Sequence, residues 1–225
     1  KIAVQGPSGS GKTMGALLIA QGLSPDSKIA LLDTENNSAG LYSDRFAFDS
    51  LNLAPPFLTS RFIEVINGAI EAGYEVLIID SLSHAWMGKG GALEMVDNAG
   101  RRSGGNGFAA WRDVTPEHNR LVDALVRCKC HLIVTMRSKM EYVLDRDEKT
   151  GKTAPRKVGM APVQRDGLEY EFDIAGDIDL SHRWVITKTR CPSLDGLAID
   201  KPGIEVGRTI AAWLSDGSAP PEPKQ

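Results

Sequence analysis

Residues 6–13 read GPSGSGKT, which fits the phosphate-binding pattern G-x-x-x-x-G-K-[ST]. The apolar run at residues 2–5 precedes this stretch and predicts a short strand. Residues 13–23 follow it with apolar side chains at helical spacing, which predicts a helix. A glycine-rich turn between a strand and the start of a helix is the context in which this pattern binds a nucleotide. We therefore expect a nucleotide site at this turn.

The residue types of this loop suit a polyphosphate. Glycines let the backbone wrap around phosphates with the N–H groups of residues 9–12 pointing inward, and the helix N-terminus adds partial positive charge. Lys12 is expected to reach the β- and γ-phosphates, and the Thr13 hydroxyl to coordinate Mg²⁺. ATP and Mg²⁺ are thus the predicted cofactors. The expected nucleotide contacts are Gly6, Pro7, Ser8, Gly9, Ser10, Gly11, Lys12, Thr13 and Met14.

Acidic residues follow two further apolar runs. Asp80 ends VLIID (76–80), which predicts a buried parallel strand whose last carboxylate lies beside the phosphate loop, where it gives Mg²⁺ a second anchor. The run ending in LLDTE places Asp33 and Glu35 at the same sheet edge. Either carboxylate can position the water that attacks the γ-phosphate. We favour Glu35 as the catalytic group, mainly through the resemblance described below.

Apolar runs alternate with helical patterns through the first part of the chain, which predicts an α/β fold with a mostly parallel central sheet flanked by helices. The third helix pattern carries Pro116 near its start. Strands are predicted at residues 2–5, 28–32, 76–79, 131–135, about 170–174 and 183–189, and helices at 13–23, 61–72, 116–128 and 209–214.

Two stretches interrupt this alternation. Residues 83–112 contain seven glycines, which predicts a long mobile loop around a short helix at 92–98. Residues 137–165 contain eight basic and four acidic residues, and a turn at Thr150–Gly151 predicts a protruding basic β-hairpin. We expect residues 1–215 to form a single domain, with this insertion at about 137–165, and residues 216–225 to be a disordered tail.

Composition excludes several classes of protein. The 225 residues carry a net charge of -3, so the chain is not a globally basic nucleic-acid binder. Three cysteines are too few for a disulfide framework, and Cys128-Lys129-Cys130-His131 lacks a second ligand pair for a metal. No apolar run has the length of about 18 residues that a membrane helix needs, and no signal peptide is visible. We therefore expect a cytoplasmic protein without membrane partners. The chain begins without Met directly before a strand pattern, so we expect residues upstream.

The order of these motifs resembles the RecA-like ATPase core: a phosphate loop, a strand ending in DTE, a strand ending in DSL and a fourth strand with a polar tip. The strings SHAW (83–86), NGFAAW (106–111) and VGMAPVQRDGLEYEFD (158–173) are similar to those of phage-type AAA ATP-binding proteins, some grouped with single-strand annealing and recombination proteins. The likeness extends from residue 1 to about 213. It implies a RecA-like P-loop ATPase, encoded by a phage and located in the bacterial host cytoplasm.

The resemblance also implies roles for individual residues. In this family the equivalent of Glu35 activates water. Lys188 and Arg190 match a Lys-x-Lys or Lys-x-Arg pair that reaches the nucleotide of a neighbouring subunit, which implies a homo-oligomer, a ring or a filament, with active sites completed in trans. A basic surface pair on an edge strand is the alternative. RecA carries Gln at the tip of the fourth strand, but Thr135 and Arg137 stand here as the alternative γ-phosphate sensors.

RecA-like proteins contact single-stranded DNA through the loops after the third and fourth strands, which correspond to the two irregular stretches. Basic residues beside aromatic ones suit sequence-tolerant binding of DNA or RNA, with Phe108, Trp111 and Tyr142 as stacking candidates. A solvated charged hairpin, or a lid over ATP, is the alternative. The candidate phosphate contacts are Arg101, Arg102, Lys139, Lys152, Arg156 and Lys157.

Three hypotheses about function follow. The first is a DNA-stimulated ATPase that acts on single-stranded DNA in recombination or annealing, together with a recombination protein that the sequence does not specify. The second is an ATP-gated DNA-binding module with negligible turnover. The third is a small-molecule P-loop kinase that uses the basic stretch as a lid; the DTE strand end and the pair Lys188 and Arg190 weigh against it.

Overall fold

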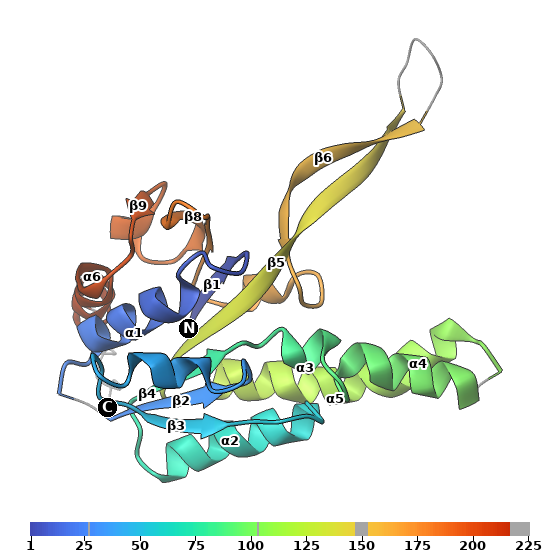
Figure 1. The fold of residues 1–225 in the computed structure, drawn as a ribbon, viewed down its shortest axis with the longest axis horizontal. Coiled ribbons are helices and arrows are strands. Elements are labelled where there is room, and N and C mark those ends of the chain that lie inside the picture. The colour runs from blue at the N-terminus through green and yellow to red at the C-terminus, as the bar shows by residue number, and fades with distance from the viewer. Residues whose placement is uncertain (27, 103, 147–152, 217–225) are drawn as a thin grey trace, which may run out of the picture.

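The strands of the computed structural model form one sheet in the order β3-β2-β4-β5-β1-β7-β8-β9, with β6 paired to β5 alone (Figure 1). The structure describes residues 1–26, 28–102, 104–146 and 153–216. Pairing is parallel from β3 to β7 and antiparallel beyond it. The strands are β1 (Ile2–Gly6), β2 (Ile29–Asp33), β3 (Asp49–Asn52), β4 (Val76–Asp80), β5 (His131–Arg146), β6 (Thr153–Pro162), β7 (Ile174–Ile178), β8 (Arg183–Thr189) and β9 (Ala198–Asp200).

Helices flank this sheet, so the predicted α/β architecture with a mostly parallel central sheet is confirmed. The helices are α1 (Lys12–Leu23), α2 (Thr59–Glu71), α3 (His84–Met87), α4 (Ala92–Arg102), α5 (Gly107–Arg127) and α6 (Ile204–Ser215). Side chains that alternate along β4 divide between two cores, because successive residues of a strand point to opposite faces. Val76 and Ile78 belong to the core with α1 and α6, whereas Leu77 and Ile79 belong to the core with α2 and α5.

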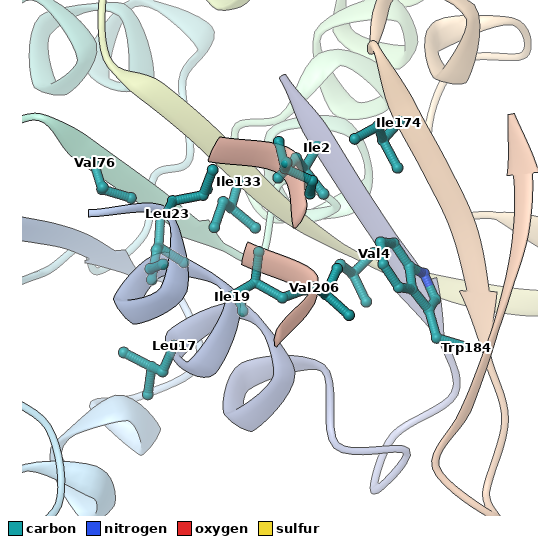
Figure 2. Close-up of a cluster of buried hydrophobic side chains, with 14 of the residues drawn as sticks. Ile2, Val4, Leu17, Ile19, Leu23, Val76, Ile133, Ile174, Trp184 and Val206 are labelled. Atoms are coloured by element: carbon teal, nitrogen blue, oxygen red, sulfur yellow. The ribbon is translucent and has the colours of Figure 1, made fainter. Parts of the chain in front are cut away.

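Figure 2 shows the first of these cores. Leu17, Ile19 and Leu23 of α1 are buried in one cluster with Ile2 and Val4 of β1, and Leu23 lies near Val76 and Ile133 of the neighbouring strands. Each large apolar side chain buried in this way stabilises the fold by about 1.5–3 kcal/mol. The core therefore fixes α1 against β1, and with it the turn that joins them.

The protruding hairpin is also present. The first part of β5 pairs with β4 and β1, and the second part leaves the sheet and pairs with β6 from Ser138↔Pro162 to Arg146↔Thr153. Figure 1 shows this hairpin projecting from the body of the protein. The turn predicted at Thr150–Gly151 lies outside the described residues.

The short helix predicted at 92–98 lies within α4, but the rest of residues 83–112 is not the predicted long loop, because α3, the last turn of α4 and the start of α5 occupy much of it. The Asn106 side chain accepts hydrogen bonds from the backbone N–H groups of Phe108 and Ala109 and so caps α5 well before Pro116. Ala92 and Ala99 of α4 pack with Ala110 and Val114 of α5. Capping and packing thus outweigh the glycine content, and Pro116 lies inside the helix rather than near its start.

Several other boundaries differ from the sequence predictions. The strands β3 and β9 were not predicted, because they are short and lack an apolar run. The strand expected near 170–174 begins only at Ile174, after a 3₁₀ helix at Leu168–Glu171. The last helix, α6, is longer than the predicted 209–214. Residues 217–225 of the predicted tail lie outside the described part.

Within the described part, no helix is both long and apolar enough to span a membrane.

Candidate nucleotide site

The phosphate loop joins the end of β1 to the start of α1. Gly9 and Gly11 have φ values of 80° and 88°, a left-handed conformation that glycine adopts without a steric penalty. Gly6 lies against β7, where an added Cβ would be 2.3 Å from the Ile178 carbonyl oxygen. The Ser10 hydroxyl donates to the Pro7 carbonyl at 2.9 Å, which closes the turn. Close contact at Gly6 and positive φ values at Gly9 and Gly11 therefore account for the three glycines of the loop.

Lys12 is folded back over this loop. Its Nζ donates to the Pro7 carbonyl at 2.7 Å. Partial burial lowers the pKa of the Lys12 ammonium group, while the nearby carboxylates of Asp80 and Glu35 raise it. The Lys12 ammonium group therefore lies near two carboxylates in a partly buried site. A phosphate oxygen bound in the loop would replace the Pro7 carbonyl as its hydrogen-bond acceptor.

Thr13 and Asp80 meet where a divalent cation would lie. The Thr13 hydroxyl donates to Asp80 Oδ2 at 2.5 Å, and the Thr135 hydroxyl donates to Oδ1 of the same carboxylate. Burial raises the pKa of the Asp80 carboxyl, and the two hydroxyl donors lower it. Mg²⁺ in nucleotide sites usually takes one or two protein oxygen ligands and completes its shell with phosphates and water. The oxygens of Thr13 and Asp80 fit that requirement.

Asp33 and Glu35 differ sharply in their surroundings. Asp33 is fully buried and accepts hydrogen bonds from two backbone N–H groups, those of Glu35 and Ala39. Glu35 lines the cavity beside the phosphate loop, and both of its oxygens accept from the Arg137 guanidinium, with Nε 2.9 Å from Oε1. Of the two candidate carboxylates, the structure places Glu35 beside the phosphate loop and gives Asp33 a structural role.

A cavity of about 610 Å³ lies beside the loop, within the range of about 300–1,000 Å³ typical of small-molecule sites. Its far wall comes from the C-terminal third of the chain, which sequence reasoning missed. His182 has φ of 63°, and its Nδ1 lies 3.0 Å from the Ser10 carbonyl oxygen. No local motif marks this wall, because β7 reaches β1 only in the folded sheet. Its residues are Ile178, His182, Lys201 and Pro202.

Lys188 and Arg190 lie at the opposite edge of the sheet from the phosphate loop. Ile2 and Ile174 are neighbours at the start of β1 and β7, and Thr189 pairs with Ile174. The Lys188 ammonium donates to the carbonyls of Tyr170 and Phe172, and Arg190 forms an ion pair with Asp173 at 3.2 Å. The two cations therefore cannot reach the nucleotide site of their own chain.

The candidate DNA contacts fall on two separate projections. Arg101 and Arg102 are exposed in the last turn of α4, and Lys139 is exposed on β5. Arg156 and Lys157 lie on β6 opposite Val143 and Tyr142 of β5. Lys152 lies outside the described residues. Figure 1 shows the hairpin and the α4–α5 pair pointing in different directions.

The aromatic candidates are not equivalent. Phe108, in the first turn of α5, is 91% exposed. Trp111 instead stacks on Trp86 with ring centroids 5.7 Å apart, so one of its faces is already covered. Phe108 is therefore the freer of the two for stacking on a base.

The strand–loop–helix unit, the adjacent Asp80 and this strand order define a P-loop nucleotide-binding protein of the RecA type. A family model described as "AAA domain" matches residues 1–196, and the chain belongs to that family. Comparison with curated proteins gives no match. A solved structure, the "Crystal structure of the RadB recombinase", is similar at 18% identity with a TM-score of 0.49, over 90% of this chain and 88% of that one.

Proposed function

We propose that this protein is a Mg²⁺-dependent ATPase. The observation that carries the proposal is that Lys12, Thr13, Asp80 and Glu35 all line one cavity beside the phosphate loop. In this proposal the loop N–H groups and Lys12 bind the β- and γ-phosphates, and Thr13 with Asp80 holds Mg²⁺. Bound Mg²⁺ would neutralise charge that develops on the phosphate oxygens.

Glu35 acts as the general base in this proposal. Its carboxylate takes a proton from a water whose oxygen attacks the γ-phosphorus. The bond from that phosphorus to the β–γ bridging oxygen breaks, and ADP and inorganic phosphate leave. Because Glu35 is paired with Arg137 in this structure, the step requires that pair to open.

We further propose that the protein acts on single-stranded DNA in phage-type recombination or annealing, as a homo-oligomer. The basic hairpin leaves the sheet at the edge where the phosphate loop lies, because β5 runs parallel to β1. Lys188 and Arg190 lie at the other edge, so their proposed target is the nucleotide of a neighbouring subunit. This arrangement would make turnover depend on assembly and on DNA.

Measured turnover tests this proposal. ATP hydrolysis is followed with and without single-stranded DNA over a range of protein concentrations, with Lys12→Ala as the inactive control. DNA-stimulated turnover that rises more steeply than protein concentration is expected. Turnover per subunit that changes neither with DNA nor with protein concentration would contradict both parts of the proposal, action on DNA and active sites completed in trans.

An ATP-gated DNA-binding module is the second candidate function. The specific observation in its favour is the bidentate ion pair of Glu35 with Arg137. This pair engages both carboxylate oxygens of Glu35, the residue proposed as the general base, and so keeps them from water. ATP-dependent retention on DNA with no measurable phosphate release would favour this candidate over the ATPase.

A further inference from the structure

Two residues beside the phosphate loop have a left-handed backbone although both carry long side chains. His182 has φ of 63° and Lys201 has φ of 51°. The Lys201 N–H donates to the His182 carbonyl at 2.8 Å, and both residues line the cavity of the nucleotide site. This conformation is uncommon for residues other than glycine, and it persists where the surrounding structure fixes it, often at functional sites. The wall of the cavity is therefore held in a strained form.

A turn between β7 and β8 sets the direction of His182. Oδ1 of Asp179 accepts from the N–H groups of Ser181 and Arg183, at 2.8 and 3.0 Å. The Asp179 carbonyl accepts from the His182 N–H at 3.0 Å. Because β7 runs parallel to β1, the turn after β7 lies beside the phosphate loop, which follows β1. The turn thus presents the His182 ring to that loop.

The His182 ring contacts the peptide unit between Ser10 and Gly11. Its Nδ1 lies 3.0 Å from the Ser10 carbonyl oxygen. A carbonyl can only accept, so Nδ1 carries the proton and donates it. An added Cβ on Gly11 would lie 3.1 Å from the same nitrogen. The ring therefore lies close to both residues that form this peptide unit.

The contact fixes the direction of the Gly11 N–H group. The Ser10 carbonyl and the Gly11 N–H belong to one trans peptide unit, so they point in opposite directions. With the carbonyl bound to His182, the N–H is turned away from the His182 ring. Glycine rotates about φ at little steric cost, so this unit would rotate more freely without the hydrogen bond.

Building on the proposed ATPase function, we infer that His182 is a positioning residue for the phosphate loop. It holds the Ser10–Gly11 peptide unit so that the Gly11 N–H donates to the nucleotide phosphates. Oriented backbone N–H groups bind an anion most tightly when they are aimed before it arrives. The strained backbone of His182 is retained because it brings the ring to the Ser10 carbonyl.

Three substitutions of His182 separate its donor from its backbone strain. Asparagine tolerates the left-handed region and its Nδ2 is a donor at about the place of Nδ1, so His182→Asn should bind nucleotides as the wild type does. His182→Gly removes both the strain and the donor, and His182→Ala removes the donor alone. Dissociation constants are measured for ADP and for the non-hydrolysable analogue AMP-PNP, each with Mg²⁺. His182→Gly and His182→Ala should weaken both by roughly 10- to 100-fold, the effect of one hydrogen bond to a charged group.

Urea denaturation of the same variants distinguishes positioning from a structural role. His182→Gly should be more stable than His182→Ala, because glycine relieves the strain, although both bind nucleotides weakly. A residue that only supported the fold would give one order in both measurements. Nucleotide affinity that follows stability across the three variants, or His182→Asn binding as weakly as His182→Gly, would overturn the inference. If His182→Gly does not fold, His182→Ala and His182→Asn decide the question.

A pair of glycine substitutions tests the contact itself. Gly9 and Gly11 both have positive φ, but an added Cβ meets His182 only at Gly11, and nothing lies within 4 Å of one at Gly9. The stability lost in Gly11→Ala should shrink in the His182→Gly background, whereas the loss in Gly9→Ala should be the same in both backgrounds. An equal loss for Gly11→Ala in both backgrounds would show that the ring does not hold this unit.

Two failures are distinguishable. A wild-type protein that binds neither nucleotide would defeat the proposed function, and the inference with it. Wild-type binding that His182→Gly and His182→Ala both retain in full would defeat the inference alone.

Discussion

The Asp33 carboxylate holds the backbone of Glu35: Asp33 Oδ1 lies 2.6 Å from the Glu35 nitrogen, and Oδ2 accepts from Ala39 at 2.8 Å. Asp33 is completely buried, so both of its oxygens are committed to the segment after β2. The Glu35 side chain lines the cavity instead. The Asp33 carboxylate thus fixes the backbone after β2, whereas the Glu35 carboxylate is the one placed at the nucleotide site.

Glu35→Gln should reduce ATP turnover by about 10²- to 10⁴-fold, the usual contribution of a general base, while nucleotide binding is retained. Phosphate release under single-turnover conditions measures this effect. Asp33→Asn is the matched comparison: it removes a charged acceptor from two backbone donors and should lower the free energy of unfolding by about 1–3 kcal/mol. Wild-type turnover in Glu35→Gln would refute its role as base.

Lys12→Ala should abolish detectable nucleotide binding, because the variant loses the cation proposed to bind the β- and γ-phosphates and keeps the nearby Asp80 and Glu35 carboxylates, which repel them. Calorimetric titration with ADP and AMP-PNP measures this loss. Lys28→Ala, an exposed lysine away from the cavity, is the control and should bind both nucleotides normally. Normal affinity in Lys12→Ala would show that the site is wrongly assigned.

Gly6→Ala should destabilise the protein by about 1–3 kcal/mol, the usual cost of overpacking, because the new methyl group would lie 2.3 Å from the Ile178 carbonyl oxygen. Gly68→Ala, within α2, is the control: nothing lies within 4 Å of its added Cβ. This control should stabilise the helix by about 0.5–1 kcal/mol. Urea denaturation compares the two; equal effects would show that the contact between β1 and β7 is looser than described.

Neutralising the basic projections should weaken binding to single-stranded DNA. Lys139→Gln and Arg101→Gln each remove one exposed cation, and each should reduce the slope of log affinity against log salt by about 0.7 if the residue contacts a phosphate. Arg208→Gln, on α6, is the control and should leave the slope unchanged. A variant with an unaltered slope identifies a cation that does not contact DNA.

Mixing two inactive variants tests completion in trans. Lys12→Ala lacks a functional nucleotide site, and Arg190→Ala lacks the proposed trans cation. A mixture should recover part of the turnover, because the Arg190 of the first variant can reach the nucleotide of the second. The rate of phosphate release, compared with each variant alone, measures this recovery. No recovery at any ratio would argue that Arg190 serves only its ion pair with Asp173.

Local sequence patterns predicted those site residues that a strand and the turn directly after it position. GPSGSGKT and VLIID each place their functional residues by a strand and the turn that ends it, so the approach of Thr13 to Asp80 followed from the parallel sheet. The partnership of Glu35 with Arg137 joins residues 102 apart, and no periodicity marks it. Within 83–112 the short helix predicted at 92–98 is present as part of α4, but α3 and the early start of α5 were missed, because the Asn106 cap and the packing of α4 on α5 override the glycine content.

The separation of the phosphate loop from Lys188 and Arg190 has a consequence for symmetry. If these cations serve a neighbour's nucleotide, a two-fold dimer completes both of its sites reciprocally, because residue i meets j of the partner and j meets i. A head-to-tail contact instead repeats from subunit to subunit. An open chain of n subunits then has n−1 complete sites, with one incomplete site at an end, and only closure into a ring completes them all.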